Sequence, residues 1–575
     1  MKAFTEPLLS LAGFEEMTKT AEKSSGLISV TGCIDAQKSQ MIYAFGGHRK
    51  NKLIVTFGEQ KAKELYDEYS FFDKEVVYYP SKDVLFYQSD IRGNLLTAER
   101  IRALKAIREQ ERVTLVTTFD ALMNTMAPIE KMWENVLTLE QGQLLDLKEI
   151  QAALIRMGYE KEYQVQTMGQ FSVRGGILDV FPLTEENPIR IELWGDEIDT
   201  IRYFDCESQK SIENIDRVSI YPAAELVLSD EEKAGGIDKL KAEAKRVSDK
   251  LRKQMKTEEA HRVTVMADEL TEEWGELSMY AGMDAFLSYF FDERVGLLDY
   301  FKPSDSLIFF DELTRCTEQG KLTETEFSES MKQRLAMGYI LPGQMNGLFT
   351  EKEIVAKLGK YSCIALAALD NKANGLHQLG SYGIHCQSVS PYNNSFELLI
   401  KDLKRYKKNG YRVILLSGSR TRAKRLSEDI TDQGITCFYT ENYDHELFEG
   451  QIMVCYGKVR RGFEYPILKF AVITESDIFG AQQKKKKRHR TYEGEKIQSF
   501  TDLSVGDYVV HENHGLGIYR GIEKLEVDKK VKDYIKIEYQ GGSNLYILAT
   551  QLDMIQKYAG KDARKPRLNK LGGQE

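Results

Sequence analysis

The chain has 575 residues and a net charge of −9, and 42% of its residues are hydrophobic, 10% aromatic and 29% charged. This length and composition are typical of a folded protein of roughly three to five domains, and they exclude a collagen-like or disordered chain. The apolar runs are far shorter than the roughly 18 residues of a membrane span, and no signal peptide is recognisable. The seven cysteines form no C-x-x-C pair, which favours reduced thiols. We therefore expect a cytoplasmic protein that does not contact a membrane.

Charge is unevenly distributed along the chain. Residues 481–575 carry 19 Lys and Arg against 13 Asp and Glu, which leaves a net charge of −15 for residues 1–480. Such an acidic body argues against a large DNA-binding surface, because neutralising phosphates requires clustered cations. The exception is the basic run at 484–490, which is either a solvated linker or a contact for nucleic acid or an acidic protein.

Strand and helix patterns alternate over the first 125 residues. The strand patterns lie at 27–30, 52–56 and 113–116. Strands separated by helices of this length predict a parallel sheet with crossover helices. A further apolar strand pattern at 306–310 is expected to join this sheet, so we assign an α/β domain to residues 1–125 and 300–340.

Two insertions are expected within this domain. Residues 126–225 begin with a helical pattern and continue with alternating strand patterns, joined at Gly195-Asp196 by a hairpin turn, which predicts an α+β domain. Residues 226–299 are mainly helical and highly charged, and we expect them to form a separate helical insert.

Three segments are expected after the first domain. Residues 345–480 read as a second, small α/β domain, and residues 481–499 as a basic linker. Residues 500–560 hold short alternating strands at close spacing, which predict a small closed β-barrel of the Tudor or SH3 type, because closure hides strand edges. Residues 561–575 are expected to begin another linker. The predicted fold class is therefore multidomain, with α/β and α+β parts.

The segment after the first strand is close to a phosphate-binding loop. It reads G-C-I-D-A-Q-K-S from Gly32 to Ser39, which matches G-x-x-x-x-G-K-[ST] except that Gln37 replaces the second glycine. A side chain at that position intrudes on the phosphates, whereas Lys38 and Ser39 retain suitable chemistry. Asp311 and Glu312 follow a buried strand, as does the acidic pair that holds Mg²⁺ in such ATPases. The alternatives are an active ATPase and a nucleotide fold that has lost its nucleotide, and Gln37 favours the second.

No catalytic residue or metal site is predicted. His-Glu-Asn-His at 511–514 is one residue shorter than the zinc signature H-E-x-x-H. A binding role is better supported for Arg174, which precedes Gly175-Gly176 between two strand patterns, at a predicted exposed hairpin. Arginine is common at protein interfaces because it pairs with carboxylates in a bidentate manner. From spacing alone, a surface arginine beside a turn explains Arg174 equally well.

Two stretches of sequence resemble known proteins. The run F-S-V-R-G-G-I-L-D-V-F-P at 171–182, followed by R-I-E-L-W-G-D-E-I at 190–198, resembles the UvrA-binding domain of the excision-repair protein UvrB. The run V-G-D-Y-V-V-H-E-N-H-G-L-G-I-Y-R-G at 505–521 looks like a CarD-type domain that interacts with RNA polymerase. The two in this order resemble the N-terminal part of the bacterial transcription-repair coupling factors. The first α/β domain then resembles a degenerate RecA-like lobe of UvrB.

The resemblance implies an adaptor in transcription-coupled nucleotide excision repair. It would bind the RNA polymerase β subunit through residues 500–560 and recruit UvrA through Arg174 and Phe181, although an aromatic residue on a strand is also commonly a core residue. In the family, the ATP- and Mg²⁺-dependent DNA translocase lies C-terminal to the polymerase-interacting domain, which here means beyond residue 575. We therefore expect no enzyme activity and no cofactor in this chain, and weak or no binding to double-stranded DNA.

Two other functions remain open. The first is a UvrB-like, ATP-dependent DNA repair subunit, although residues 87–95 leave no room for the aromatic DNA-clamping hairpin of UvrB. The second is a CarD-like transcription regulator without a role in repair. Binding of ATP would favour the first, and failure to bind UvrA would favour the second.

The polymerase contact is expected on the strand pattern at 522–527. A small barrel leaves part of a strand edge open, and an open edge can pair with a strand of a partner. Leu525 lies between Lys524 and Glu526 and alternates with them, so it is either a core leucine or an exposed apolar anchor with a charged rim. The resemblance favours the anchor.

Overall fold

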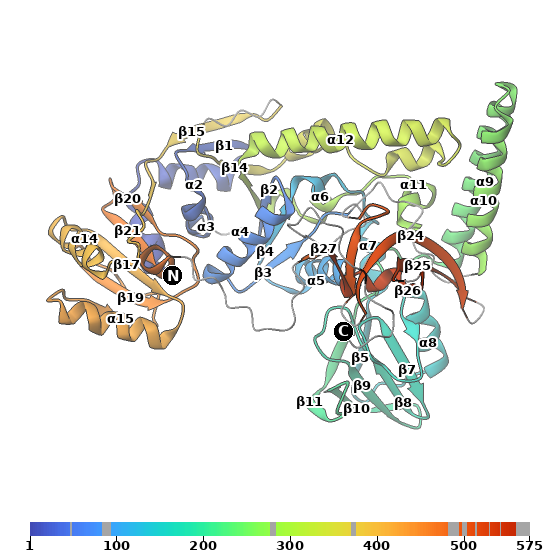
Figure 1. The fold of residues 1–575 in the computed structure, drawn as a ribbon, viewed down its shortest axis with the longest axis horizontal. Helices are drawn as coiled ribbons and strands as arrows, with labels where there is room; N and C mark the ends of the chain where they lie inside the picture. Colours follow the sequence, from blue (N-terminus) through green and yellow to red (C-terminus); the bar gives the residue numbers. More distant parts are fainter. Residues whose placement is uncertain are drawn as a thin grey trace.

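The computed structural model describes residues 1–45, 49–82, 94–276, 283–369, 375–480, 494–496, 503–511, 514–527, 530–540, 542–558 and 568 (Figure 1). The predictions for the basic run at 484–490, for a missing hairpin near residue 87 and for most of 561–575 lie outside these residues. Within the described ranges, none of the helices combines the length and the apolar character that a membrane crossing requires.

A seven-stranded sheet organises the first domain, and its strand order is β15-β1-β14-β13-β2-β4-β3. All its pairings are parallel, which confirms the predicted parallel sheet. β2, β4, β13 and β14 are buried along their whole lengths, as expected for a parallel sheet covered on both faces. The strands are β1 (Gly26–Thr31), β2 (Asn51–Thr56), β3 (Val76–Tyr79), β4 (Val113–Thr118), β13 (Ser306–Asp311), β14 (Ser362–Leu366) and β15 (Gln378–Gly383).

Two strands of this sheet come from beyond residue 345, where we expected the second α/β domain to begin. β14 is fully buried and pairs with β1 on one side and with β13 on the other. β15 pairs with the free side of β1. The apolar run Ser362–Leu366 therefore lies inside the first sheet, and the second sheet starts only at β16 (Gln387–Ser388).

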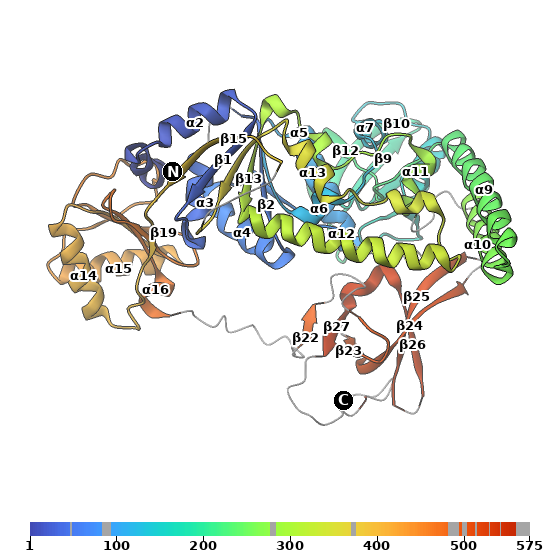
Figure 2. The same cartoon turned by 90° about the horizontal axis from the view of Figure 1, so that it is seen from above.

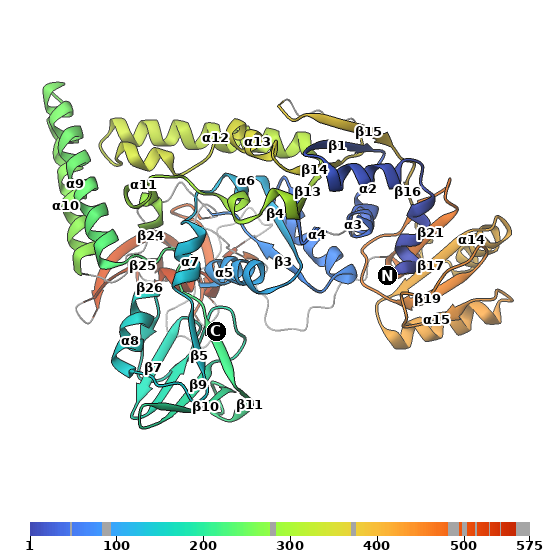
Figure 3. The same cartoon turned by 180° about the vertical axis from the view of Figure 1, so that it is seen from behind.

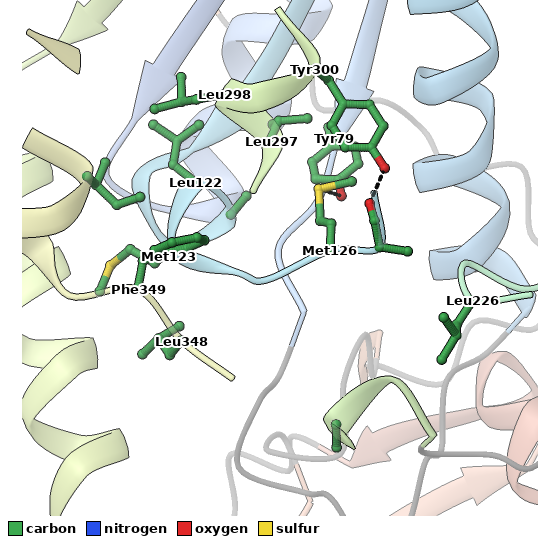
Figure 4. Packing of buried hydrophobic residues seen from close by; sticks show 14 of the residues in the cluster. Tyr79, Leu122, Met123, Met126, Leu226, Leu297, Leu298, Tyr300, Leu348 and Phe349 are labelled. Carbon is green, nitrogen blue, oxygen red and sulfur yellow. Dashed lines mark hydrogen bonds between the residues drawn. The ribbon is translucent and has the colours of Figure 1, made fainter. Parts of the chain in front are cut away.

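Helices cover the first sheet, and a large apolar core lies where the inserts join it. Figure 4 shows part of this core, in which Tyr79, Leu122, Met126 and Tyr300 come from distant segments of the chain. The Tyr300 hydroxyl donates to the carbonyl of Ala127 over 2.6 Å, so the buried polar group is satisfied. The helices are α1 (Lys2–Thr5), η1 (Glu6–Ser10), α2 (Phe14–Lys23), α3 (Asp35–Ala44), α4 (Glu59–Phe72), α5 (Asn94–Glu109), α6 (Phe119–Met123), α7 (Ile129–Glu134), η3 (Leu297–Tyr300), η4 (Pro303–Asp305), α12 (Leu313–Ala336), η5 (Pro342–Asn346) and α13 (Glu351–Leu358).

The first insert is a twisted sheet with one helix, as the alternating pattern predicted. Its strand order is β11-β10-β9-β8-β7-β6, and β12 pairs separately with β5. Along β9, Ile189 and Ile191 are buried in the core while Arg190 and Glu192 lie on the other face. The elements are β5 (Leu137–Glu140), α8 (Leu147–Arg156), β6 (Glu160–Lys161), β7 (Gln170–Arg174), β8 (Ile177–Val180), β9 (Ile189–Trp194), β10 (Glu197–Phe204), β11 (Ser211–Ile215) and β12 (Arg217–Ile220).

The second insert is dominated by a long helical hairpin. α9 (Asp230–Lys253) begins with a capping box formed by Ser229 and Glu232, and it packs against α10 (Thr257–Glu276). The pair projects from the end of the molecule opposite the second α/β unit, as Figures 1 and 3 show. The shorter elements η2 (Met283–Phe286) and α11 (Leu287–Phe290) follow it. An added Cβ at Gly236 of α9 would lie 2.1 Å from the Phe290 ring, so the close packing requires glycine there.

The second α/β unit has its own six-stranded sheet, ordered β16-β20-β21-β17-β19-β18, and a separate apolar core. It contains β16, α14 (Phe396–Lys408), β17 (Arg412–Ser417), α15 (Arg420–Asp432), β18 (Phe438–Tyr439), β19 (Ile452–Tyr456), β20 (Phe463–Tyr465), β21 (Phe470–Thr474) and α16 (Glu475–Phe479). Figure 2 shows it at the end of the molecule away from the last β-rich domain, although the two follow one another in sequence.

The last domain is a strongly curved sheet of order β22-β27-β23-β24-β25-β26 around a small core that includes Val509, Ile535 and Ile537. The predicted strands are present, although β24 spans 13 residues and β25 spans 9, and the pairings among the described residues do not close into a barrel. The elements are β22 (Gly494–Lys496), β23 (Tyr508–His511), β24 (Gly515–Val527), β25 (Lys530–Glu538), β26 (Asn544–Leu548), η7 (Ala549–Met554) and β27 (Ile555–Tyr558).

Candidate binding sites

The loop after β1 does not form a phosphate cradle. α3 already begins at Asp35, so Gln37 and Lys38 are helical residues and the loop is short. The backbone N–H groups of Gly32, Cys33 and Gln37 donate to backbone carbonyls of Ala368, Ala367 and Ile34 at 3.0–3.2 Å. A phosphate-binding loop needs such groups free to point at the phosphates. In this loop, these three N–H groups already donate to carbonyls of the protein itself.

Lys38 is buried in a cluster of carboxylates. Its ammonium lies 2.5 Å from a carboxylate oxygen of Asp311 and 2.9 Å from one of Glu312, and both Lys38 and Asp311 are 1% exposed. Burial acts to lower the pKa of Lys38, but the attraction of Asp311 and the hydrogen bonds outweigh it, so the pKa is raised. Asp311 also accepts a hydrogen bond from the Thr56 hydroxyl over 2.8 Å. Lys38 is therefore paired with Asp311 and Glu312 at the position where an active loop would hold a nucleotide and Mg²⁺.

Gln37 and Asp35 do not suit a nucleotide either, whereas the Ser39 hydroxyl does not argue against one. Gln37 is fully buried, and its amide nitrogen lies 3.9 Å from the Met41 sulfur. The Ser39 hydroxyl and the Gln37 amide oxygen have no hydrogen-bond partner among the described residues. Asp35 lies 3.0 Å from Lys61 and 3.3 Å from Lys38, so its carboxylate is already paired within the protein. The residues present do not fit ATP, and no group of three or more His, Cys, Asp or Glu in the described ranges is arranged to hold a metal ion.

Arg174 lies at the end of β7, and Gly175 follows it with a φ of 61°, a conformation that favours glycine. Its guanidinium is 39% exposed and reaches Asp179 of β8 only at 3.4 Å. Asp179 is buried and is already neutralised by Arg190 of β9, through two bonds of 2.8 and 2.9 Å. Arg174 is therefore a surplus cation at the edge of an ion-paired sheet face.

Arg190 and Asp179 are structural residues of this face that the sequence patterns did not single out. The Arg190 guanidinium also stacks 4.2 Å from the centre of the Phe204 ring and donates to Gln209 over 2.8 Å. Arg202 pairs with Glu192 over 2.6 Å on the same face. The alternation of β8 and β9 places these charges on one face. Which of Arg174 and Arg190 neutralises Asp179, however, follows only from their distances to its carboxylate. Phe181, by contrast, is only 8% exposed, which favours a packing role.

The strand proposed for polymerase binding has an open edge. β23 pairs with β24 only from Gly515 to Ile518, whereas β25 pairs with β24 as far as Val527. From Ile522 to Val527, no other described strand lies on the second side of β24. Lys524 forms an ion pair of 3.5 Å with Glu273 of α10. The side chains of Leu525 and Glu526 lie outside what the structure describes, so their roles stay predictions.

His511 gives the last domain an expected pH dependence. The side chain is 3% exposed, and burial followed by the nearby His514 lowers its pKa from 6.5 to about 4. Between these values the unfolded chain binds a proton that the folded domain excludes, so stability falls as the pH drops from 6.5 to about 4. Hydrogen exchange of residues 503–558 in the whole chain should show this loss. His511→Gln should flatten it, and an unchanged profile in that variant would assign the pH dependence to other groups.

Comparison with known proteins assigns two of these regions to domain families. Residues 137–226 match the UvrB interaction domain, and residues 503–559 match the CarD-like/TRCF RID domain. The first contains Arg174, and the second contains the open edge of β24. The chain thus combines a match to the UvrB interaction domain with a match to the CarD-like/TRCF RID domain.

Several proteins to which this chain is similar are transcription-repair-coupling factors. The protein of that name from Bacillus subtilis is 31% identical over 525 residues, which cover 91% of this chain and 44% of the relative. Those of Staphylococcus haemolyticus and Staphylococcus aureus are 30% and 29% identical and cover 95% and 98% of this chain. These findings confirm the resemblance to the transcription-repair coupling factors. The chain spans about half the length of the relatives it matches.

Proposed function

We propose that the chain acts as an adaptor in transcription-coupled nucleotide excision repair. Residues 503–559 would hold the β subunit of a stalled RNA polymerase, and residues 137–226 would recruit UvrA. The observation that carries the proposal is the presence of both interaction domains in one chain that is similar to transcription-repair-coupling factors along 91–98% of its length. Co-purification of the chain with UvrA and with the polymerase β subunit tests it.

Recruitment of UvrA would depend on Arg174. Its charge is not needed inside the domain, because Arg190 already neutralises Asp179. An exposed guanidinium that is positioned by a strand end offers two parallel donors to a carboxylate of a partner. Phe181 would support this face from below as a buried residue.

Polymerase binding would use the free edge of β24 between Ile522 and Val527. Backbone N–H and C=O groups along an unpaired strand edge can continue the sheet into a strand of the partner. The charged rim of Lys524 and Glu526 and the apolar anchor Leu525 would then select the partner strand. We also propose that this curved sheet is a Tudor/SH3-like barrel in the complete domain, and that the first lobe is a degenerate RecA-like domain.

Leu525→Arg is expected to weaken binding to the polymerase β subunit at least tenfold, or by about 1.4 kcal/mol. An arginine would remove the apolar anchor and place a third charge between Lys524 and Glu526. Surface plasmon resonance with the immobilised β subunit measures the effect. Leu398→Arg, on the exposed side of α14, is the matched control and should bind normally, because Leu398 is 51% exposed and remote from β24. If residues 503–558 unfold in the Leu525 variant, Leu525 is a core residue and not the contact for the polymerase.

We propose that this chain neither binds nor hydrolyses ATP, because Lys38 is paired with Asp311 and the loop amides already donate to backbone carbonyls. ATP-driven translocation and its Mg²⁺ would then belong to parts of the relatives that this chain does not match. The UvrB-like alternative draws support from the partnerless Ser39 hydroxyl, at the position of a Mg²⁺ ligand in active loops. Reduced thiols and the repair partners agree with a cytoplasmic location.

A further inference from the structure

The outer face of α9 carries a dense cluster of positive charge. Residues 239–253 contain seven lysines and arginines against two acidic residues, Glu243 and Asp249, although the whole chain has a net charge of −9. All seven cations are exposed, and they lie on the side of the helix away from α10 and the core: Lys239, Lys241, Lys245, Arg246, Lys250, Arg252 and Lys253. We call these seven residues the basic α9 face.

Most of this charge is not balanced within the protein. Lys241, Lys245, Lys250 and Lys253 have no ion-pair partner among the described residues. The other three cations form ion pairs of moderate to long distance: Lys239 lies 3.4 Å from Asp292, Arg246 lies 3.7 Å from Glu243, and Arg252 lies 3.9 Å from Asp249. Glu243 is also engaged by the Tyr289 hydroxyl. The face therefore presents an unneutralised positive field to the solvent.

The shape of the face suits an extended polyanion. A shallow hollow of about 470 Å³ is lined by Ala242, Lys245, Arg246, Asp249, Lys250 and Lys253. From Lys239 to Lys253 the helix extends about 21 Å at 1.5 Å per residue. Over that distance a DNA duplex carries roughly a dozen phosphates. The position of α9 at the outer end of the molecule leaves it accessible, as Figures 1 and 2 show.

We propose that the basic α9 face binds the phosphate backbone of double-stranded DNA without reading its sequence. Backbone contacts need clustered cations and no apolar surface. An interface with an acidic protein is disfavoured because such interfaces have an apolar or aromatic centre, and this hollow offers only Ala242. A membrane is disfavoured because the apolar side of α9, with Leu240 and Leu251, is buried in the protein.

This proposal revises the expectation of weak or no DNA binding by this chain. The expectation rested on the acidic total of residues 1–480, which averages the basic α9 face with the acidic residues around it. Several of these lie on the neighbouring α10, including Glu258, Asp268 and Glu272. The inference does not depend on the proposed UvrA and polymerase contacts, because it rests on a different element.

The test is a salt-dependent measurement of binding to a fluorescent 30-base-pair duplex by anisotropy, with the whole chain. The test variant is Lys245→Gln, Lys250→Gln and Lys253→Gln together. The matched control is Lys401→Gln, Lys404→Gln and Lys408→Gln on α14, which also removes three exposed positive charges. Lysine-to-glutamine changes preserve helix propensity, and circular dichroism verifies that both variants keep their helices.

We expect the α9 variant to bind at least roughly tenfold more weakly at 0.1 M salt, with a slope of log K against log salt smaller by about 3. The control should match the unaltered chain. Equal losses in both variants, or a loss confined to the α14 control, would overturn the assignment to α9, as would no binding to the duplex at 50 mM salt. If the chain binds a poly-glutamate peptide through the α9 lysines but does not bind DNA, the partner of this face is an acidic protein and the proposal is wrong.

Discussion

Replacing Lys38 by methionine is expected to lower the free energy of unfolding of the first domain by about 3–5 kcal/mol. Methionine retains most of the length of the side chain, so the main change is the loss of the ammonium. Asp311 would then be left as an unpaired charge at 1% exposure, held between strands of the central sheet. Desolvated charge without a partner is among the most destabilising features that a single substitution creates.

The prediction is checked by hydrogen exchange across β1 and β13 together with thermal melting. Lys19→Met is the control, because the Lys19–Glu15 pair is exposed to solvent and its loss should leave melting unchanged. Adding Asp311→Asn to Lys38→Met should restore part of the stability, because the double variant removes both charges of the pair.

The same variant distinguishes a structural lysine from a nucleotide-binding lysine. If the unaltered chain binds Mg-ATP saturably in a calorimetric titration, and if Lys38→Met abolishes that binding without loss of stability, the UvrB-like ATPase is the better account. We expect the opposite result: no saturable binding at millimolar Mg-ATP, and a large loss of stability.

Arg174→Ala is expected to weaken binding to UvrA about thirtyfold, or by about 2 kcal/mol, without unfolding its domain. The alanine removes a 39% exposed cation, and Asp179 keeps its bidentate partner Arg190. Surface plasmon resonance with immobilised UvrA gives the affinity, and a melting curve verifies the fold. Arg217→Ala is the matched control, because Arg217 lies in the same domain and is 65% exposed.

Arg190→Ala should behave in the opposite way and destabilise the domain. It strips the bidentate partner from Asp179, whose side chain is 2% exposed, so the cost should reach about 3 kcal/mol. Binding to UvrA would then fail through unfolding. An unchanged affinity for Arg174→Ala together with an unchanged melting curve would move the UvrA contact to another part of this domain.

The sequence allowed prediction of the elements whose patterns are local. The parallel strands of the first domain and the alternation of Ile189, Arg190 and Ile191 follow from the periodicity of apolar residues. The near-match of the segment with Gln37 and Lys38 to a phosphate-binding loop is also evident from the sequence. That Lys38 lies in contact with Asp311 could only be suspected, because the two residues are 273 positions apart and meet through the pairing of β13 in the sheet.

Several features that depend on long-range pairing or on distances between side chains could not be predicted. The boundary near residue 345 was misplaced because a buried strand such as Ser362–Leu366 carries no local signal of which sheet it joins. Only the distances to the Asp179 carboxylate show that Arg190 neutralises it and Arg174 does not: they are 2.8 and 2.9 Å for Arg190 and 3.4 Å for Arg174. The basic α9 face was hidden because charge totals over long segments average over opposite faces of a helical hairpin.

The central claim is that one chain connects RNA polymerase with UvrA. Mass photometry of the chain mixed with purified UvrA and the polymerase β subunit tests it most directly. We predict a ternary complex that loses UvrA with Arg174→Ala and loses the β subunit with Leu525→Arg, while the other partner stays bound. Mutually exclusive binding of the two partners, or binding of neither by the folded chain, would contradict the account.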